Sequence, residues 1–214
     1  MHQAPTAPAD LLAAWDREPE PHSEGDHTPD GEGWLAWNRH SPEVEFADFA
    51  AALVRLTRPE LVIETGVGQG YTTRRVLAAL QYGPPDTLPG VYLGYEADDL
   101  LRVEIQRLPD RWDHMAMVAD RPGPSDEALG RADLVILDSA PTARRLREFR
   151  AWQQHGRRGS VCLMHDVRAD HPRGRANGVH RSLARAVRAA VARPGGVDGV
   201  MLPHPRGCWL GRKR

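Results

Sequence analysis

The sequence has few of the features that mark secreted or membrane-inserted chains. Only two of its 214 residues are cysteines, too few for a framework of disulfides. No apolar run approaches the roughly 18 residues that are needed to cross a bilayer. The first twenty residues lack the basic and then apolar pattern of a signal peptide. We therefore expect a cytoplasmic protein that has no membrane partner.

Lysine is almost absent, because Lys213 is the only one and the other basic side chains are arginines. The charge is uneven: residues 1–143 hold 25 acidic and 11 basic residues, whereas residues 144–214 hold 4 acidic and 17 basic residues. A basic end can bind nucleic acid. Here, however, the arginines follow amphipathic helical patterns, and no aromatic residues alternate with them to stack on bases. We expect no nucleic-acid partner, and the sequence leaves a homodimer open.

The composition divides the chain near residue 33. Residues 1–32 are rich in Pro, Asp, Glu, His and Gly and hold few apolar residues, which is typical of a mobile segment. Residues 33–214 are long enough to form one domain with a real core. At the start of this domain, Trp34 and Trp37 either cover a substrate or pack on the core.

Strand and helix patterns alternate through this domain. Strands are predicted at 61–64, 91–95, 114–118, 133–137 and 161–164, helices at 72–80, 100–108, 143–155 and 179–192, and a terminal hairpin at 197–202 and 208–210. Such alternation predicts an α/β fold, Rossmann-like and doubly wound, whose mostly parallel seven-stranded sheet ends in an antiparallel hairpin. Ligands of such sheets bind beyond the carboxyl ends of the strands, where the strand order reverses.

A further helix is predicted just before the first strand. Ser41 has the residue type of an N-cap, Pro42 suits the first helical position, and Glu43 and Glu45 suit the first turn. The apolar residues that follow recur at helical spacing.

The most informative segment is a turn with three glycines that follows the first strand. The strand ends in Glu64, and Gly66, Gly68 and Gly70 follow at alternate positions. Glycines let the backbone approach a ligand closely, and the N–H groups that open the next helix can bind an anionic group. A dinucleotide-binding turn would have its third glycine at position 71, where this chain has Tyr71. Glu64 also suits a cofactor that carries an ammonium and a sulfonium better than it suits a pyrophosphate.

This segment resembles the first motif with which class I methyltransferases bind S-adenosylmethionine (SAM). The run Tyr95–Asp98 resembles their second motif, in which an acid accepts hydrogen bonds from the ribose hydroxyls, here Glu96 with Asp98 and Asp99 as alternatives. Asp120 stands where the family places an acid near the adenine. The resemblance therefore implies that SAM is bound by Glu64, Thr65, Gly66, Gly68, Gly70, Tyr71, Thr72, Glu96, Ala97, Asp120 and Asp138.

Two later strands carry the residues that the resemblance places at the reaction centre. The run from Asp133 to Asp138 is similar to a segment of small-molecule O-methyltransferases whose second acid faces the active site. The strand that ends in His165 and Asp166 is similar to that of the macrocin O-methyltransferase and cephalosporin-hydroxylase-like methyltransferases. The resemblance thus implies that Asp138, His165 and Asp166 are catalytic.

The resemblance leaves two versions of the chemistry open. In metal-dependent members of the group, an acid after the fourth strand and two acids after the fifth hold Mg²⁺. Here Asp138 and Asp166 would be the metal ligands, with His165 in place of one acid, although Mg²⁺ prefers oxygen ligands. In the metal-free version, His165 is a general base, because the ordinary pKa of histidine lies near neutrality.

The predicted function is SAM-dependent methylation of a small molecule, with a hydroxyl of a sugar or natural product as the methyl acceptor. The reaction would be an in-line displacement at the methyl carbon, in which the protein supplies proximity, orientation and removal of one proton. The alternatives are the metal-dependent version of this reaction, a non-catalytic subunit of the same fold, and an NAD(P)-dependent oxidoreductase.

Overall fold

A computed structural model of the chain describes residues 22–23, 35–37, 41–81, 90–97, 116–119, 123–168, 179–202 and 206–214. The predicted helix at 100–108 lies outside these residues, and so does most of the predicted mobile segment at 1–32. His22–Ser23 (β1), which belongs to that segment, pairs antiparallel with Leu35–Ala36 (β2).

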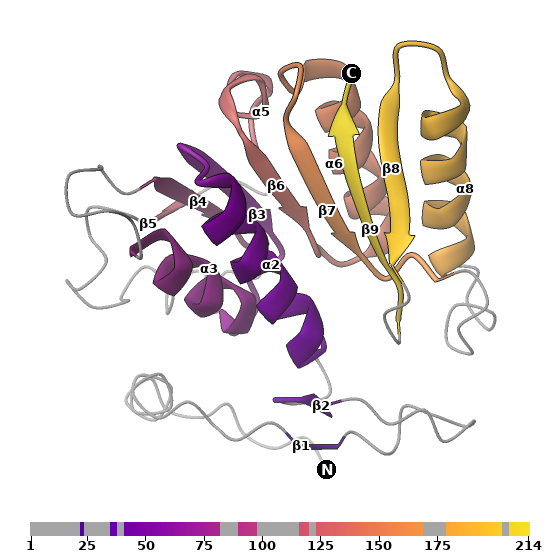
Figure 1. Cartoon of the computed structure of the whole chain (residues 1–214). Helices are drawn as coiled ribbons and strands as arrows, with labels where there is room; N and C mark the ends of the chain where they lie inside the picture. Colours follow the sequence, from indigo (N-terminus) through magenta and orange to yellow (C-terminus); the bar gives the residue numbers. More distant parts are fainter. Residues whose placement is uncertain are drawn as a thin grey trace.

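The main sheet has the strand order β5-β4-β3-β6-β7-β9-β8 (Figure 1). Its seven strands are β3 (Leu61–Thr65), β4 (Val91–Tyr95), β5 (Ala116–Ala119), β6 (Leu134–Leu137), β7 (Val161–His165), β8 (Val197–Leu202) and β9 (Cys208–Lys213). The strands from β5 to β7 are parallel, whereas β9 runs antiparallel to both β7 and β8. The predicted α/β class, with a mostly parallel sheet and an antiparallel C-terminal pair, is confirmed.

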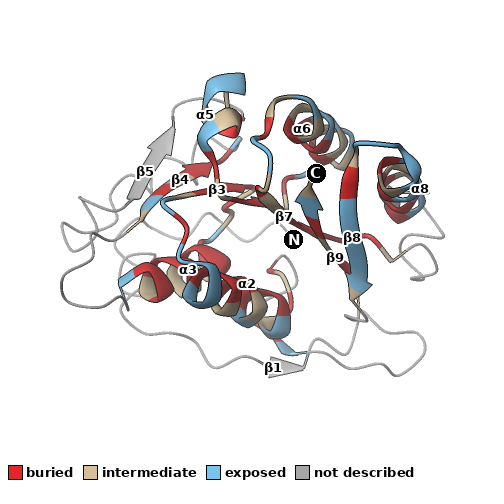
Figure 2. Cartoon of the chain, turned by 45° about the horizontal axis from the view of Figure 1, so that its top comes forward, coloured by how far each residue is buried: buried red, intermediate tan, exposed pale blue. Residues whose placement is uncertain are grey.

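Helices cover both faces of the sheet, as Figure 2 shows. On one face lie α2 (Val44–Thr57) and α3 (Tyr71–Gln81), which contact each other closely. On the other face lie α5 (Asp126–Arg131), α6 (Thr142–His155) and α8 (Val179–Ala192). Within the described ranges, every helix is too short or too polar to cross a membrane.

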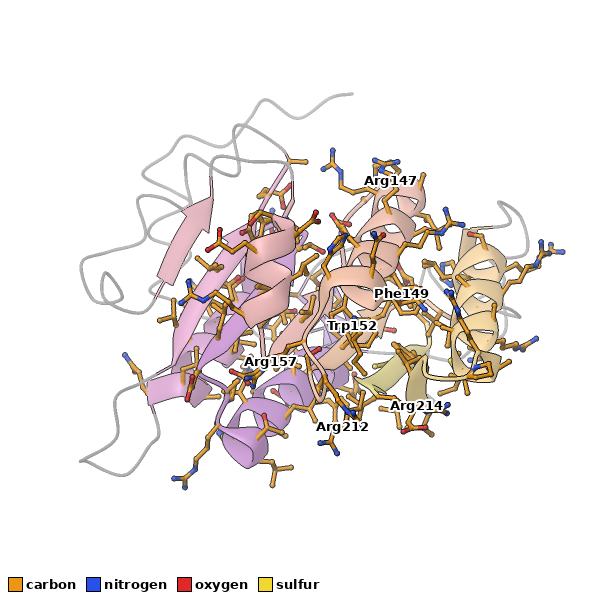
Figure 3. The ribbon with its side chains drawn as sticks, turned by 90° about the horizontal axis from the view of Figure 1, so that it is seen from above. Arg147, Phe149, Trp152, Arg157, Arg212 and Arg214 are labelled. Atoms are coloured by element: carbon orange, nitrogen blue, oxygen red, sulfur yellow. The ribbon has the colours of Figure 1, made fainter. Side chains whose placement is uncertain are left out.

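Each face of the sheet has its own hydrophobic core. Phe46 and Val54 of α2 pack with Leu77 of α3 against one face. Phe149 and Trp152 of α6 pack against the other, where both rings meet Trp209 of β9 edge to face. Figure 3 shows Phe149 and Trp152 on the inner side of α6, whereas Arg147, also on α6, is exposed. The central strands are therefore buried on both sides, as expected for a parallel sheet between two helical layers.

One local expectation is wrong, and one helix was not predicted. The helix α2 begins two residues later than predicted, because Glu43, not Ser41, is the N-cap, with extended φ and ψ angles and no side-chain capping bond. The Ser41 hydroxyl accepts instead a hydrogen bond from the backbone N–H of Trp37, 3.1 Å away. The short helix α5 was not predicted, although Ser125 caps it in the expected way by accepting from the N–H of Ala128.

Asp133 connects the starts of three strands at the edge of the sheet opposite the glycine turn. Its Oδ2 accepts from the N–H groups of Glu60 (2.8 Å) and Leu61 (3.1 Å), at the start of β3. Its backbone N–H donates to the carbonyl of Leu61, and its carbonyl accepts from the N–H of Val161, at the start of β7. Its Oδ1 forms an ion pair with Arg157. The acid that opens β6 thus fixes how far the strands are offset from one another.

We expect Asp133→Ala to lower the free energy of unfolding by about 1.5–3 kcal/mol, the usual worth of hydrogen bonds to a charged group. The measurement is urea unfolding at neutral pH. The matched control is Asp198→Ala, which removes an exposed ion pair with Arg214 and should cost about 0–1 kcal/mol. Equal, small losses for both variants would show that Asp133 does not hold the strands.

Candidate active site

A cavity of about 640 Å³ lies at the carboxyl ends of the central strands, where the strand order reverses between β3 and β6. The predicted site residues that line it are Gly66, Gly68, Tyr71, Thr72, Glu96, Ala97, Asp138 and Asp166. The rule that places ligands at this reversal therefore holds for the cavity of this chain.

Four predicted site residues do not line this cavity. Glu64, Thr65 and His165 are buried beneath it, and Gly70 closes the glycine turn through a hydrogen bond from its N–H to the carbonyl of Val67. The predicted adenine contact, Asp120, lies outside the described residues.

The glycines of the turn serve different purposes. Gly66 has a φ of +78°, and a Cβ at this position would lie 2.5 Å from the Cα of Ser139. Glycine is therefore required here for the close approach of the turn to the segment after β6. Gly68 has a φ of +56°, but a Cβ there would meet no atom of the described residues within 4 Å. At Gly68 the space belongs to the cavity.

Glu96, at the end of β4, holds the turn in place. Its Oε2 accepts from the N–H of Gly68 at 2.7 Å, and its Oε1 accepts from the N–H of Ala97 at 2.6 Å. A carboxylate has about four acceptor positions, so Glu96 can accept further hydrogen bonds from a ligand in the cavity.

Glu64 is buried in a small polar cluster under the turn. Its Oε2 accepts from the hydroxyl of Tyr92 at 2.6 Å and from that of Thr73 at 3.0 Å. Burial raises the pKa of Glu64 to about 8, and the charge of Asp138 adds to this while the two hydroxyl bonds act against it. Glu64 therefore supports the turn from below as a neutral carboxyl group, whereas the sequence predicted a direct contact with the cofactor.

Thr65 belongs to a second buried cluster, centred on Glu148 of α6. The hydroxyls of Thr65 and Ser139 both donate to Oε2 of Glu148, the former at 2.9 Å. Burial raises the pKa of Glu148. This side chain joins the ends of β3 and β6 to the helix that covers them.

His165 lies between two carboxylates, and its ring is fully buried against that of Phe46. Nδ1 is 2.9 Å from Oδ1 of Asp138, and Nε2 is 2.5 Å from Oε2 of Glu43. Burial lowers the pKa of His165, but Glu43, Asp138 and Asp166 outweigh this effect and raise it to about 10. At neutral pH the ring is therefore an imidazolium that donates from both nitrogens.

This arrangement does not suit the predicted general base. A base needs an unprotonated nitrogen within reach of the acceptor, but both nitrogens of His165 already contact carboxylates, and His165 itself does not line the cavity. The sequence could not reveal this, because Glu43 is distant in the chain. The catalytic roles of Asp138 and Asp166, which do line the cavity, stay predictions.

Arg145 of α6 joins the ends of β6 and β7. Its Nε donates to the carbonyl of Ser139 at 3.1 Å. Nη1 donates to the carbonyl of His165 at 2.9 Å and to Oδ2 of Asp166 at 3.0 Å. Nη2 donates to the carbonyl of Asp138 at 3.0 Å and pairs with Oδ1 of the same residue at 3.0 Å. A buried guanidinium thus crosslinks the two strand ends that carry the predicted catalytic acids.

Asp166 is also held by a second guanidinium, that of Arg206, just before β9. Nε of Arg206 lies 2.8 Å from Oδ1 of Asp166, and Nη2 donates to Oδ2 at 3.1 Å. The backbone of Asp166 is left-handed, with a φ of +60°, which is uncommon for a residue other than glycine. Burial acts to raise the pKa of Asp166, but Arg206, His165 and Arg145 hold it well below the ordinary value.

Arg206 completes the cluster through Glu43. Its backbone N–H donates to Oε1 of Glu43 at 2.9 Å. Burial acts to raise the pKa of Glu43, yet His165 and Arg206 lower it to about 2. The N-cap residue of α2 is therefore an ionised part of this cluster.

A divalent ion at this site would need ligand atoms that lie close together and are not already paired. One ligand atom each of Asp138, His165 and Asp166 lies within 4.8 Å of the others, close enough to surround an ion. However, the two carboxylates already pair with Arg145, and the imidazole donates to acids. As arranged, these residues do not fit a metal ion.

Sequence reasoning missed Glu43, Arg145, Glu148 and Arg206. For two of them a signal existed: the buried residues of α6 are Arg145, Glu148, Phe149 and Trp152, so both charged side chains share a stripe with the aromatic core residues. A charged residue on an apolar stripe is a candidate for a buried ion pair. Glu43 and Arg206 carried no such signal.

Tyr71, which lines the cavity, belongs to a stacked aromatic pair. The ring of Trp37 stacks on that of Tyr71, with centroids 4.8 Å apart, and Arg75 lies over Trp37. Trp37 is buried. Of the two predicted roles for this tryptophan, packing describes its position better.

Comparisons with known proteins identify the fold. No family model matches the chain, and no curated protein matches its sequence. Among solved structures, it is similar to an O-methyltransferase from Bacillus cereus in complex with S-adenosylhomocysteine (SAH), with a TM-score of 0.63, 15% identity, and coverage of 83% of this chain and 84% of that one.

Two further structures match almost the whole chain. The O-methyltransferase TomG from Streptomyces achromogenes, involved in tomaymycin synthesis and solved with SAM, has a TM-score of 0.58 and 17% identity, covering 98% of this chain and 91% of its own. The SAH-bound methyltransferase PaMTH1 of Podospora anserina has a TM-score of 0.63 and 14% identity, covering 100% and 98%.

The chain therefore has the fold of class I SAM-dependent methyltransferases. Within that class, the structures that it matches include several O-methyltransferases.

The raised pKa of Glu64 predicts a pH-dependent stability. Because the pKa is about 8 in the folded state and about 4.5 in the unfolded state, this residue's contribution is fully present below pH 4.5 and is lost as the pH rises toward 8. We expect Glu64→Gln, which keeps an oxygen acceptor, to remove this dependence. Urea unfolding from pH 5 to 8 should show the wild type losing stability relative to the variant, by at most about 1.4 kcal/mol per pH unit. Parallel stability curves would contradict a neutral Glu64.

Proposed function

We propose that this chain is a SAM-dependent methyltransferase that acts on a small molecule, with a hydroxyl as the methyl acceptor. The observation that carries the proposal is the cavity, which brings the glycine turn after β3, Glu96 after β4 and Asp138 after β6 together at the reversal of the sheet. The shared fold with O-methyltransferases supports the reaction class.

The cofactor would lie across the turn. Gly66 and Gly68 line the cavity, so the backbone can approach the methionine part closely. Glu96 is in place to accept hydrogen bonds from the ribose hydroxyls, and Tyr71 and Thr72, at the start of α3, offer the anionic carboxylate a helix N-terminus. SAM supplies an activated methyl group when it is bound.

Asp138 is the acid best placed to contact the acceptor. It lines the cavity, and both contacts to its side chain, from Arg145 and His165, are made by Oδ1. Two positively charged side chains therefore contact this oxygen and fix the direction of the carboxylate. A hydroxyl that donates to Oδ2 of Asp138 would be oriented for attack and could lose its proton there.

Nothing in the described residues favours the alternatives in the same way. Tyr71 occupies the position of the third glycine of a dinucleotide-binding turn and lines the cavity, which argues against an oxidoreductase. The open space at Gly68 and the inward-facing Glu96 would be unexplained in a subunit that binds no cofactor.

The first test uses the two glycines that have left-handed backbone and open space. Asparagine tolerates this backbone region, so Gly68→Asn should fold normally but should place its side chain in the cavity. Isothermal calorimetry should show that SAH binding falls at least tenfold, about 1.4 kcal/mol.

The matched control for this test is Gly195→Asn. Gly195 has a φ of +66°, has no atom within 4 Å of an added Cβ and does not line the cavity. It should bind SAH as the wild type does. If both variants kept wild-type affinity, the glycine turn would not be the cofactor site.

The second test removes the carboxylate of Glu96. Hydrogen bonds to a charged group contribute about 1.5–3 kcal/mol, so Glu96→Ala should weaken SAH binding tenfold or more. The same calorimetry with adenosine alone should show a comparable loss, because the lost contacts are to the ribose. A variant that lost SAH affinity but bound adenosine normally would place Glu96 at the other end of the cofactor.

A further inference from the structure

We propose that the guanidinium of Arg145 takes the place of a divalent metal ion between Asp138 and Asp166, so that this chain binds no metal at its reaction centre. The inference rests on the proposed function, since it concerns how the same site is built. It depends on one difference: the metal-dependent sites that the sequence resembles hold an ion between their acids, whereas this cluster has Arg145 between Asp138 and Asp166.

Arg145 donates four hydrogen bonds and makes one further ion-pair contact within its own chain. A guanidinium has five N–H groups, and Arg145 makes five contacts, with the carbonyls of Ser139, His165 and Asp138 and with the carboxylates of Asp138 and Asp166. All of them lie between 2.9 and 3.1 Å. The side chain is only 5% exposed. Arg145 is therefore a buried part of the site and not a surface residue.

The charges of the cluster are balanced without an ion. Three carboxylates, those of Glu43, Asp138 and Asp166, face three cations. The cations are the guanidiniums of Arg145 and Arg206 and the imidazolium of His165. An added divalent ion would bring two positive charges into a buried group that is already neutral, which is electrostatically unfavourable.

The existing contacts of these residues also disfavour an ion among them. Mg²⁺ and related ions need several oxygen ligands at about 2.0–2.6 Å. The oxygen of Asp138 that faces the cluster, Oδ1, is shared by Arg145 and His165, and both oxygens of Asp166 lie against Arg206. An ion could enter only if these pairs separated.

Arg145 is therefore a positioning residue. It directs the strand ends and fixes the charge beside the cavity, and the five contacts described above all go to groups of its own chain. A metal ion, by contrast, could bind the hydroxyl oxygen of the methyl acceptor as one of its ligands.

The decisive experiment measures Mn²⁺ binding by electron paramagnetic resonance, with SAH binding measured by calorimetry on the same EDTA-treated wild-type chain. At about 1 mM Mn²⁺, near the weak end of divalent-ion affinities in proteins, we expect no bound ion and normal SAH binding. One bound Mn²⁺ that is lost in Asp138→Asn, in a chain that binds SAH, would overturn the metal-free site alone. Absence of SAH binding would overturn the proposed function instead.

Removing the guanidinium should allow the cluster to bind a metal ion. Arg145→Ala removes the cation that pairs with both Asp138 and Asp166 and leaves the cluster with one net negative charge, so this variant should bind one Mn²⁺, and Mn²⁺ should raise its melting temperature. A purely structural role for Arg145 would destabilise the variant without creating an ion site. The control is Arg147→Ala on the exposed side of the same helix, which should neither bind Mn²⁺ nor respond to it. If Arg145→Ala folded and bound no ion, Arg145 would not stand in for a metal.

Discussion

The bonds of Arg145 hold together the floor of the cavity. At the carboxyl ends of parallel strands, backbone carbonyls have no further strand partner, and when buried they must find donors. In this chain one guanidinium satisfies three of these carbonyls and two carboxylates, across two neighbouring strands. Breaking a buried charge pair by removing one partner costs about 3–5 kcal/mol, so the positions of Asp138 and Asp166 depend strongly on this side chain.

The other half of the site depends on close backbone contact. The turn at Gly66 approaches the segment after β6 so closely that a Cβ would overlap Ser139, and Glu96 holds the far side of the same turn through Gly68. Two buried carboxyl groups, Glu64 and Glu148, support the turn and the neighbouring strand ends from below. The cavity is therefore lined on one side by closely packed backbone and on the other by charged side chains whose charges balance.

The sequence predicted the elements of the fold and the residues that line the cavity better than it predicted their roles. Hydrophobic period and glycine spacing are local properties, so the strands, the turn and Glu96 could be recognised. The roles of His165 and Glu64 could not be, because each depends on distant residues: Glu43 lies 122 positions from His165, and Tyr92 lies 28 positions from Glu64. Arg145 could have been found, since it stands on the buried stripe of its helix.

The full engagement of Arg145 has a consequence for how the molecule recognises what it modifies. A coordination sphere can exchange a water molecule for an entering alcohol, and this gives any hydroxyl a generic point of attachment. A guanidinium that is bound to groups of its own chain offers no such exchange. Discrimination among acceptors would then depend on other residues that line the cavity, such as Pro42, Pro141 and Arg144. Related chains with the same cluster around Arg145 could differ in substrate through changes at these lining residues alone.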